Sequence, residues 1–164
     1  MLFLKLSYHI NAAIKKFFLK GIYSKRFVFG EKFTFRKSFE IMIGRDGKVK
    51  IGDNCFFNNY CSIFSNKKIK IGNGTIFGEN VKIYDHNHRF KDQNVLIKNQ
   101  GYSNGEIFIG DNCWIGSNVT ILKGAKIGNN CVIGAGCIIK GEVPNCTIVV
   151  VNQELSKTEI INKS

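Results

Sequence analysis

Apolar residues recur at every sixth position over much of the chain. One run of these anchor residues lies between residues 51 and 83, and a second consists of Ile109, Ile115, Ile121, Ile127, Ile133 and Ile139. A helix repeats every 3.6 residues and a strand alternates every two, so a period of six fits neither alone. A short strand plus a turn, repeated along a solenoid, produces it. The pattern therefore predicts an all-β fold, a parallel β-helix.

Two further positions of the six-residue unit carry their own signals. Three residues after most anchors stands Asn or Gly, at Asn54, Asn66, Gly74, Asn80, Asn112, Asn118, Gly124, Asn130 and Gly136. These residue types tolerate a positive φ angle, so a left-handed corner is expected there, with Tyr60 as an exception in the series. One residue later the side chains are small, at Cys55, Cys61, Thr75, Val81, Cys113, Val119, Ala125, Cys131 and Cys137. Small residues beside bulky anchors suit a narrow prism.

The repeat divides the chain into three regions. We expect a helix and irregular first coils over residues 1–42, the β-helix over 43–150 and a tail over 151–164. Within residues 1–22 an apolar helical stripe comprises Leu6, Ile10, Ala13, Ile14 and Phe17. This amphipathic helix is expected to cap the first coil or pack on a neighbouring subunit. The alternative is that the basic helix lies on the inner face of a membrane.

The six-residue pattern stops between residues 85 and 106 and then resumes. An excursion of this length from a regular solenoid is typical of a functional loop. Two of the three histidines, His86 and His88, stand at its start. The predicted fold is thus a β-helix with one protruding loop that carries the histidine pair.

The net charge of +12 is concentrated near the start of the chain. Residues 1–40 hold nine Lys or Arg against Glu31 and Glu40, which gives +7. Such a charge favours nucleic acid, an anionic membrane or an anionic ligand. No nucleic-acid-binding motif accompanies it, so nucleic acid is excluded as a partner. Neither a membrane-spanning run nor a cleavable signal is recognisable, so we expect a soluble or peripheral protein.

Six cysteines raise the alternatives of disulfides or a zinc site. Five of the six occupy the small inward position, where a thiol behaves as a small hydrophobic group. We therefore expect reduced, structural cysteines and a cytoplasmic location.

The histidine pair offers a general base, because the pKa of histidine suits proton transfer near neutral pH. If the segment is extended, His86 and His88 share one face, and periodicity does not choose between them. A catalytic metal site would need a third histidine, and only His9 in the predicted helix remains. We therefore predict no metal.

Several motifs resemble a known family. They are the pair Ile83-Tyr84 before the histidines, the long loop, IGDNCWIGSN at 109–118 and IGNNCVIGAG at 127–136. Over residues 50–145 the chain resembles the hexapeptide-repeat acyltransferases, in particular the maltose, galactoside and nodulation-factor O-acetyltransferases and those of capsule and lipopolysaccharide clusters. The resemblance implies a left-handed β-helix, an exception to the usual crossover hand, and a homotrimer with active sites between subunits.

The resemblance also assigns roles to residues. His88 is the implied base, and Asn58 positions the reacting groups and the acceptor. Asp85 orients one of the histidines or binds the acceptor. His86 is an expected acceptor-binding residue. The implied acetyl-CoA contacts are Trp114, Gly116, Ser117, Ala135 and Lys140. The alternative for Trp114 is a packing aromatic, and for Asn58 a turn residue.

The implied reaction is direct transfer of an acetyl group from acetyl-CoA, a co-substrate, to a sugar hydroxyl, without a tightly bound cofactor. The backbone N–H of Ser117 meets the oxyanion by resemblance. Two departures concern the coenzyme: IKGEVP at 139–144 lacks the family's Thr-Lys, for which Lys140 is the substitute, and VVNQE at 150–154 differs from the family's ending. The alternatives are a non-catalytic scaffold, a nucleotide-sugar N-acyltransferase or a serine acetyltransferase.

Overall fold

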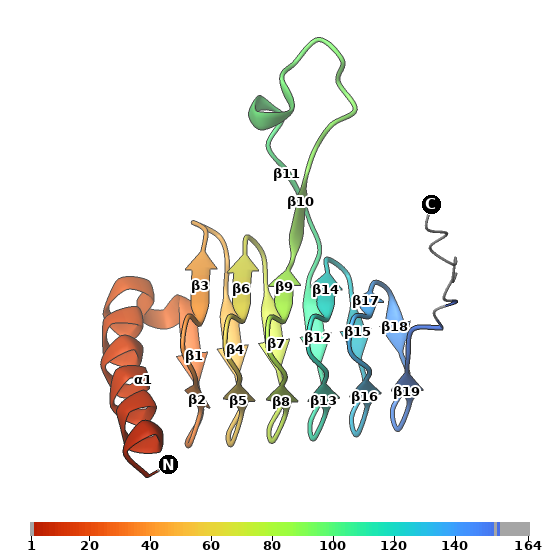
Figure 1. The fold of residues 1–164 in the computed structure, drawn as a ribbon. Helices are drawn as coiled ribbons and strands as arrows, with labels where there is room; N and C mark the ends of the chain where they lie inside the picture. The colour runs from red at the N-terminus through yellow and green to blue at the C-terminus, as the bar shows by residue number, and fades with distance from the viewer. Residues whose placement is uncertain (1, 153, 155–164) are drawn as a thin grey trace, which may run out of the picture.

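The computed structural model describes residues 2–152 and 154, with side chains from residue 8 onward, so most of the predicted tail lies outside the described residues. A helix lies at one end of a solenoid of short parallel strands, and one long loop protrudes from its side (Figure 1). The chain passes through three sheets in turn, so each full coil contributes one strand to each sheet. The predicted β-helix is confirmed.

The three sheets form the faces of a triangular prism. The first contains β1 (Phe27–Phe29), β4 (Val49–Ile51), β7 (Ile69–Ile71), β12 (Ile107–Ile109), β15 (Lys126–Ile127) and β18 (Glu142–Val143). The second contains β2 (Thr34–Phe35), β5 (Phe56–Phe57), β8 (Ile76–Phe77), β13 (Trp114–Ile115), β16 (Val132–Ile133) and β19 (Ile148–Val149). The third contains β3 (Glu40–Ile43), β6 (Ser62–Ser65), β9 (Lys82–Tyr84), β14 (Thr120–Leu122) and β17 (Ile138–Ile139). All pairings within these sheets are parallel.

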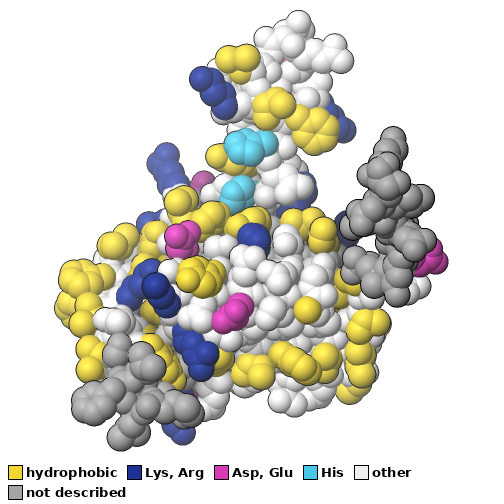
Figure 2. Space-filling model, viewed as in Figure 1, with side chains coloured by type: hydrophobic (Ala, Val, Ile, Leu, Met, Phe, Trp, Pro, Cys, Tyr) yellow, Lys and Arg dark blue, Asp and Glu magenta, His cyan; other side chains and the backbone are white. Residues whose placement is uncertain are grey.

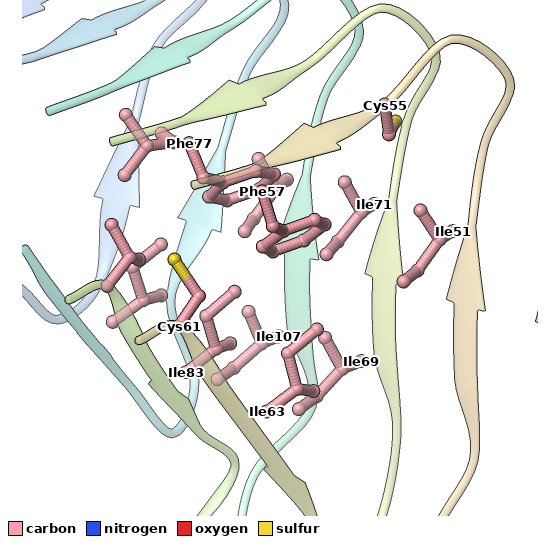
Figure 3. Close-up of a cluster of buried hydrophobic side chains, with 14 of the residues drawn as sticks. Ile51, Cys55, Phe57, Cys61, Ile63, Ile69, Ile71, Phe77, Ile83 and Ile107 are labelled. Carbon is pink, nitrogen blue, oxygen red and sulfur yellow. The ribbon is translucent and has the colours of Figure 1, made fainter. Parts of the chain in front are cut away.

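The anchors stack on one another along the interior of the prism. Ile109 pairs with Ile71 on one side and Ile127 on the other. The rings of Phe57 and Phe77 stack with centroids 4.0 Å apart (Figure 3). The nine small residues that follow the corners are all buried, as predicted. Each coil therefore buries the anchors of its neighbours, which is how a solenoid builds a core without distant contacts.

The predicted left-handed corners are present at eight of the nine Asn and Gly positions. Asn66 is the exception, because the chain there takes a longer turn whose backbone N–H groups point at a buried carboxylate of the next coil. Conversely, Tyr60 adopts a φ of +62° although it is neither Asn nor Gly. The coil geometry imposes the corner at Tyr60 despite its residue type.

A ladder of Asp and Asn side chains connects the coils at the corner between the first and second sheets. Each accepts a hydrogen bond from a backbone N–H of the preceding coil, the acceptors being Asp53, Asn73, Asp111, Asn129 and Asn145. The glycines before the donors leave room for this contact, since a Cβ on Gly110 would lie 2.4 Å from Oδ1 of Asn129. The ladder explains why Gly follows the anchors of the first sheet.

The first coil is regular from residue 27, whereas the sequence predicted irregular structure up to residue 42. Its strands pair in register with those of the second coil. Phe27, Phe33 and Phe39 are six residues apart and almost fully buried, so phenylalanine replaces isoleucine as the anchor. The corner residues Lys32 and Ser38 have positive φ without being Asn or Gly, which concealed the repeat.

The helix α1 (Leu2–Tyr23) forms as predicted and leads through a short 3₁₀ turn, η1 (Ser24–Arg26), into the first coil. It packs on that coil through Ala12 and Leu19. The Nζ atoms of Lys15 and Lys16 donate hydrogen bonds to the carbonyl oxygens of Phe39 and Phe33.

The predicted apolar stripe does not face the solenoid. Ile10, Ala13, Ile14 and Phe17 are exposed, and the side chain of Leu6 lies outside the described residues. The helix therefore meets the first coil with its other face, and contact of the stripe with a neighbouring subunit or a membrane stays a prediction. Among the described residues, no helix combines the length and the apolarity needed to cross a membrane.

Candidate active site

The protruding loop begins and ends in a two-stranded stem. After β9, β10 (His86–His88) pairs antiparallel with β11 (Tyr102–Asn104), and a 3₁₀ turn, η2 (Ile97–Asn99), lies between them. The ring of Tyr102 contacts the rings of both His86 and His88, with centroids 5.0 and 4.6 Å away. The two histidines therefore share one face of an extended strand, as the sequence indicated. Figure 2 shows histidine side chains at the surface where the loop leaves the solenoid.

Asp85 connects the loop root to the coil before it. Its carboxylate is fully buried. It accepts hydrogen bonds from the Ser65 hydroxyl (2.7 Å) and from the backbone N–H groups of Asn66 (2.7 Å) and Lys67 (2.9 Å). The remaining contact is with Nδ1 of His86, 3.1 Å from Oδ1. Asp85 therefore orients the ring of His86, a choice between the two histidines that the sequence had left open.

A hollow of about 790 Å³ lies against the loop. Its lining includes His88, Arg89, Phe90, Lys91, Ser103 and Lys123. Lys123, from the corner after β14, donates a hydrogen bond to the Ser103 hydroxyl in the loop stem. The hollow thus brings an imidazole together with basic and hydroxyl groups, a lining suited to a polar, hydroxyl-bearing ligand.

Asn58, Gly116, Ser117 and Ala135 lie along a different edge of the prism. Each follows a strand of the second sheet, namely β5, β13 or β16, at the corner with the third sheet. Oδ1 of Asn58 accepts a hydrogen bond from Arg36, and the Ser117 hydroxyl accepts one from the N–H of Glu79. The coils approach closely here, since a Cβ on Gly116 would lie 2.7 Å from the nitrogen of Ala135.

His88 and Lys140 belong to the opposite edge of the third sheet, because both follow its strands. The width of that sheet separates the two edges by roughly 20 Å, from about 3.3 Å per residue. Trp114 projects from the second sheet and is 56% exposed, so it does not pack in the core. In one chain, the predicted site residues therefore form two groups that do not meet.

The five inward cysteines are buried and free, whereas Cys146 is exposed and free. Burial raises the pKa of the Cys61 thiol to about 11 and raises the pKa values of Cys55 and Cys113 as well. Thiols held neutral in this way are poor nucleophiles. Among the described residues, no group of three or more His, Cys, Asp or Glu side chains is arranged to hold a metal ion.

The sequence did not single out Tyr102, Arg89 or Lys123. Tyr102 lies opposite His88 because the loop ends pair as a hairpin, and Lys123 reaches the stem from the next coil. If the two ends of the loop had been assumed to pair as a hairpin, the sequence alone would have predicted Tyr102 beside the histidines. Only the stacking of coils brings Lys123 there.

Comparisons with known proteins agree with this architecture. A family model described as bacterial transferase hexapeptide (six repeats) matches residues 106–141. The chain is 33% identical over 128 residues to WbbJ of Escherichia coli K12, which is named as a lipopolysaccharide biosynthesis O-acetyl transferase; the match covers 74% of this chain and 65% of that protein.

Two solved structures are also similar. A maltose O-acetyltransferase from Clostridium difficile 630 matches with a TM-score of 0.64 and 31% identity over 79% of this chain and 67% of that chain. A galactoside acetyltransferase in complex with coenzyme A matches with a TM-score of 0.68 and 29% identity over 79% and 63%, respectively.

The chain belongs to the hexapeptide-repeat acyltransferase family, and its solenoid is the left-handed parallel β-helix of that family. It spans 65% of the length of WbbJ and about half the length of several other curated relatives.

Proposed function

We propose that the protein is an acetyl-CoA-dependent O-acetyltransferase that acts on a sugar hydroxyl of a surface polysaccharide or its precursor. The observation that carries the proposal is the imidazole of His88, which lines a polar hollow at the root of the loop on a β-helix of an acyltransferase family. Similarity to WbbJ supports the polysaccharide setting, and similarity to a galactoside acetyltransferase solved with coenzyme A supports the sugar acceptor and the coenzyme.

In the proposed reaction His88 is the general base. It takes the proton of the acceptor hydroxyl while the oxygen attacks the thioester carbonyl of acetyl-CoA. The tetrahedral oxyanion accepts a hydrogen bond from the backbone N–H of Ser117. The carbon–sulfur bond then breaks, and the protonated His88 returns its proton to the departing thiolate. The products are the acetyl ester and free coenzyme A.

The proposal requires a neighbouring subunit. Because His88 and Ser117 lie on different edges of one prism, His88 of one protomer must meet Asn58 and Ser117 of another. In a closed ring of three prisms packed side by side, the edge of one protomer that carries His88 meets the edge of the next that carries Ser117. This contact occurs three times in the ring. The loop presents Phe90, Leu96 and Ile97 to solvent, and a second protomer would cover this apolar surface. Acetyl-CoA would lie in the groove between the protomers.

The first test compares His88→Ala with His86→Ala. Release of free thiol from acetyl-CoA is followed with galactosides, maltose, a nucleotide-linked amino sugar and serine as acceptors. His88→Ala should lower the rate with a sugar hydroxyl by roughly a hundredfold to ten-thousandfold and leave coenzyme A binding by calorimetry unchanged. A near-normal rate for His88→Ala would exclude it as the base. If the wild-type protein preferred the amino sugar or serine, the proposed sugar hydroxyl acceptor would be wrong.

The second test examines the shared site. His88→Ala and Asn58→Ala chains are co-expressed so that they assemble together. If each site takes His88 from one protomer and Asn58 from the next, random mixing restores intact sites at about one quarter of the interfaces. Activity near that fraction, from two inactive parents, is expected. No rescue in verified mixed trimers would contradict a site between subunits.

A further inference from the structure

The side of α1 that faces away from the solenoid is strongly apolar. Five large side chains there are each more than half exposed, and we refer to them as the outer stripe: Ile10, Ile14, Phe17, Phe18 and Ile22. At 100° per residue they lie on one side of the helix, opposite Ala12 and Leu19. Hydrophobic side chains gather over α1 in Figure 2. The helix covers the first coil with its less apolar face, so capping does not account for the outer stripe.

The surroundings of the outer stripe are basic. Residues 1–40 carry +7, and although Lys15 and Lys16 turn toward the first coil, Lys20 and Lys25 remain at the end of the stripe. A hollow of about 390 Å³ at the end of α1 is lined by Lys20, Lys25, Ser24 and the residues of β1. Two ammonium groups and a hydroxyl beside an apolar wall suit a phosphate group attached to an acyl chain.

We propose that α1 docks on an anionic lipid surface. The outer stripe would enter the boundary between headgroups and acyl chains, while Lys20 and Lys25 contact lipid phosphates. Charge favours this occupant over a second copy of the chain, because a second copy would bring its own Lys20 and Lys25 ammonium groups toward those of the first. The helix lies along the surface and does not cross it.

The test uses the full chain and vesicles of phosphatidylcholine with or without one third phosphatidylglycerol. The wild-type protein should sediment with the anionic vesicles, and less so as salt is raised. Phe17→Ser with Phe18→Ser, and separately Lys20→Glu with Lys25→Glu, should each lower the partition coefficient at least tenfold. Ile148→Ser is the matched control, since Ile148 is an equally exposed apolar residue at the far end of the solenoid, and it should bind like wild type.

Three outcomes would overturn the proposal. The first is wild-type protein that stays in solution with both vesicle types. The second is a Phe17→Ser, Phe18→Ser variant that binds as wild type does. The third is a smaller particle mass for that variant by light scattering with vesicle binding unchanged, which would identify the outer stripe as a contact between copies. Acyl transfer to a soluble acceptor should be unchanged in every variant, so this test is independent of the proposed chemistry.

Discussion

Replacing Asp85 by alanine removes the buried carboxylate that holds the loop root to the preceding coil. Four donors lose their acceptor: the Ser65 hydroxyl, the N–H groups of Asn66 and Lys67, and Nδ1 of His86. A hydrogen bond to a charged group contributes about 1.5 to 3 kcal/mol, but water replaces part of the loss at the half-exposed donors. We therefore expect about 3 to 5 kcal/mol of destabilisation, a large share of the roughly 5 to 15 kcal/mol of a typical domain.

Guanidinium unfolding measures the loss, and hydrogen exchange locates it. The amides of Asn66 and Lys67 should lose protection in Asp85→Ala, while amides within the first coil keep theirs. Asp85→Asn should lie between wild type and Asp85→Ala, because its amide retains only one of the two acceptor oxygens.

The matched control is Asp111→Ala. Asp111 is exposed, and its carboxylate accepts one bond, from the N–H of Asn73, so its removal should cost about 1 kcal/mol or less. Equal costs for Asp85→Ala and Asp111→Ala, with the amides of Asn66 and Lys67 still protected, would refute the role assigned to Asp85.

Three further predictions concern the packing of the coils. Gly110→Ala places a methyl group 2.4 Å from Oδ1 of Asn129, so it should cost about 2 kcal/mol or more, whereas Gly21→Ala in the open helix should be neutral or stabilising by up to about 1 kcal/mol; equal thermal midpoints would contradict this. In the native protein, a thiol reagent should label Cys146 rapidly and Cys61 only after unfolding, and fast reaction of more than one thiol per chain would contradict the packing. Because burial raises the pKa of Cys61 from 9.0 to about 11, its neutral form contributes stability that is complete below pH 9 and is lost as the pH rises towards 11. Cys61→Ala should flatten that alkaline loss in unfolding experiments.

The candidate site shows where prediction from sequence ends. The histidine pair and its loop were visible as an interruption of a regular pattern, and the shared face followed from strand geometry. The sequence did not reveal most of the hydrogen bonds to Asp85. Three of its four donors lie outside the histidine motif, and two of these three belong to the longer turn at Asn66. The separation of Asn58 from His88 also required the sheet order.

The winding of the solenoid was determined by the sequence itself. Anchor, corner and small residue recur within each hexad, and every coil packs on the next in the same way, so a local pattern is sufficient to specify the core. The pattern was missed only in the first coil, where Phe27, Phe33 and Phe39 are the anchors and the corners lack Asn and Gly.

The orientation of α1 was decided by the tertiary structure. Helical periodicity defines which residues share a face but not which face meets the solenoid. At the end of the solenoid, the carbonyl groups of Phe33 and Phe39 need donors, and Lys16 and Lys15 supply them. Satisfying these part-buried carbonyl groups turns Lys15 and Lys16 toward the solenoid, and the apolar stripe faces outward.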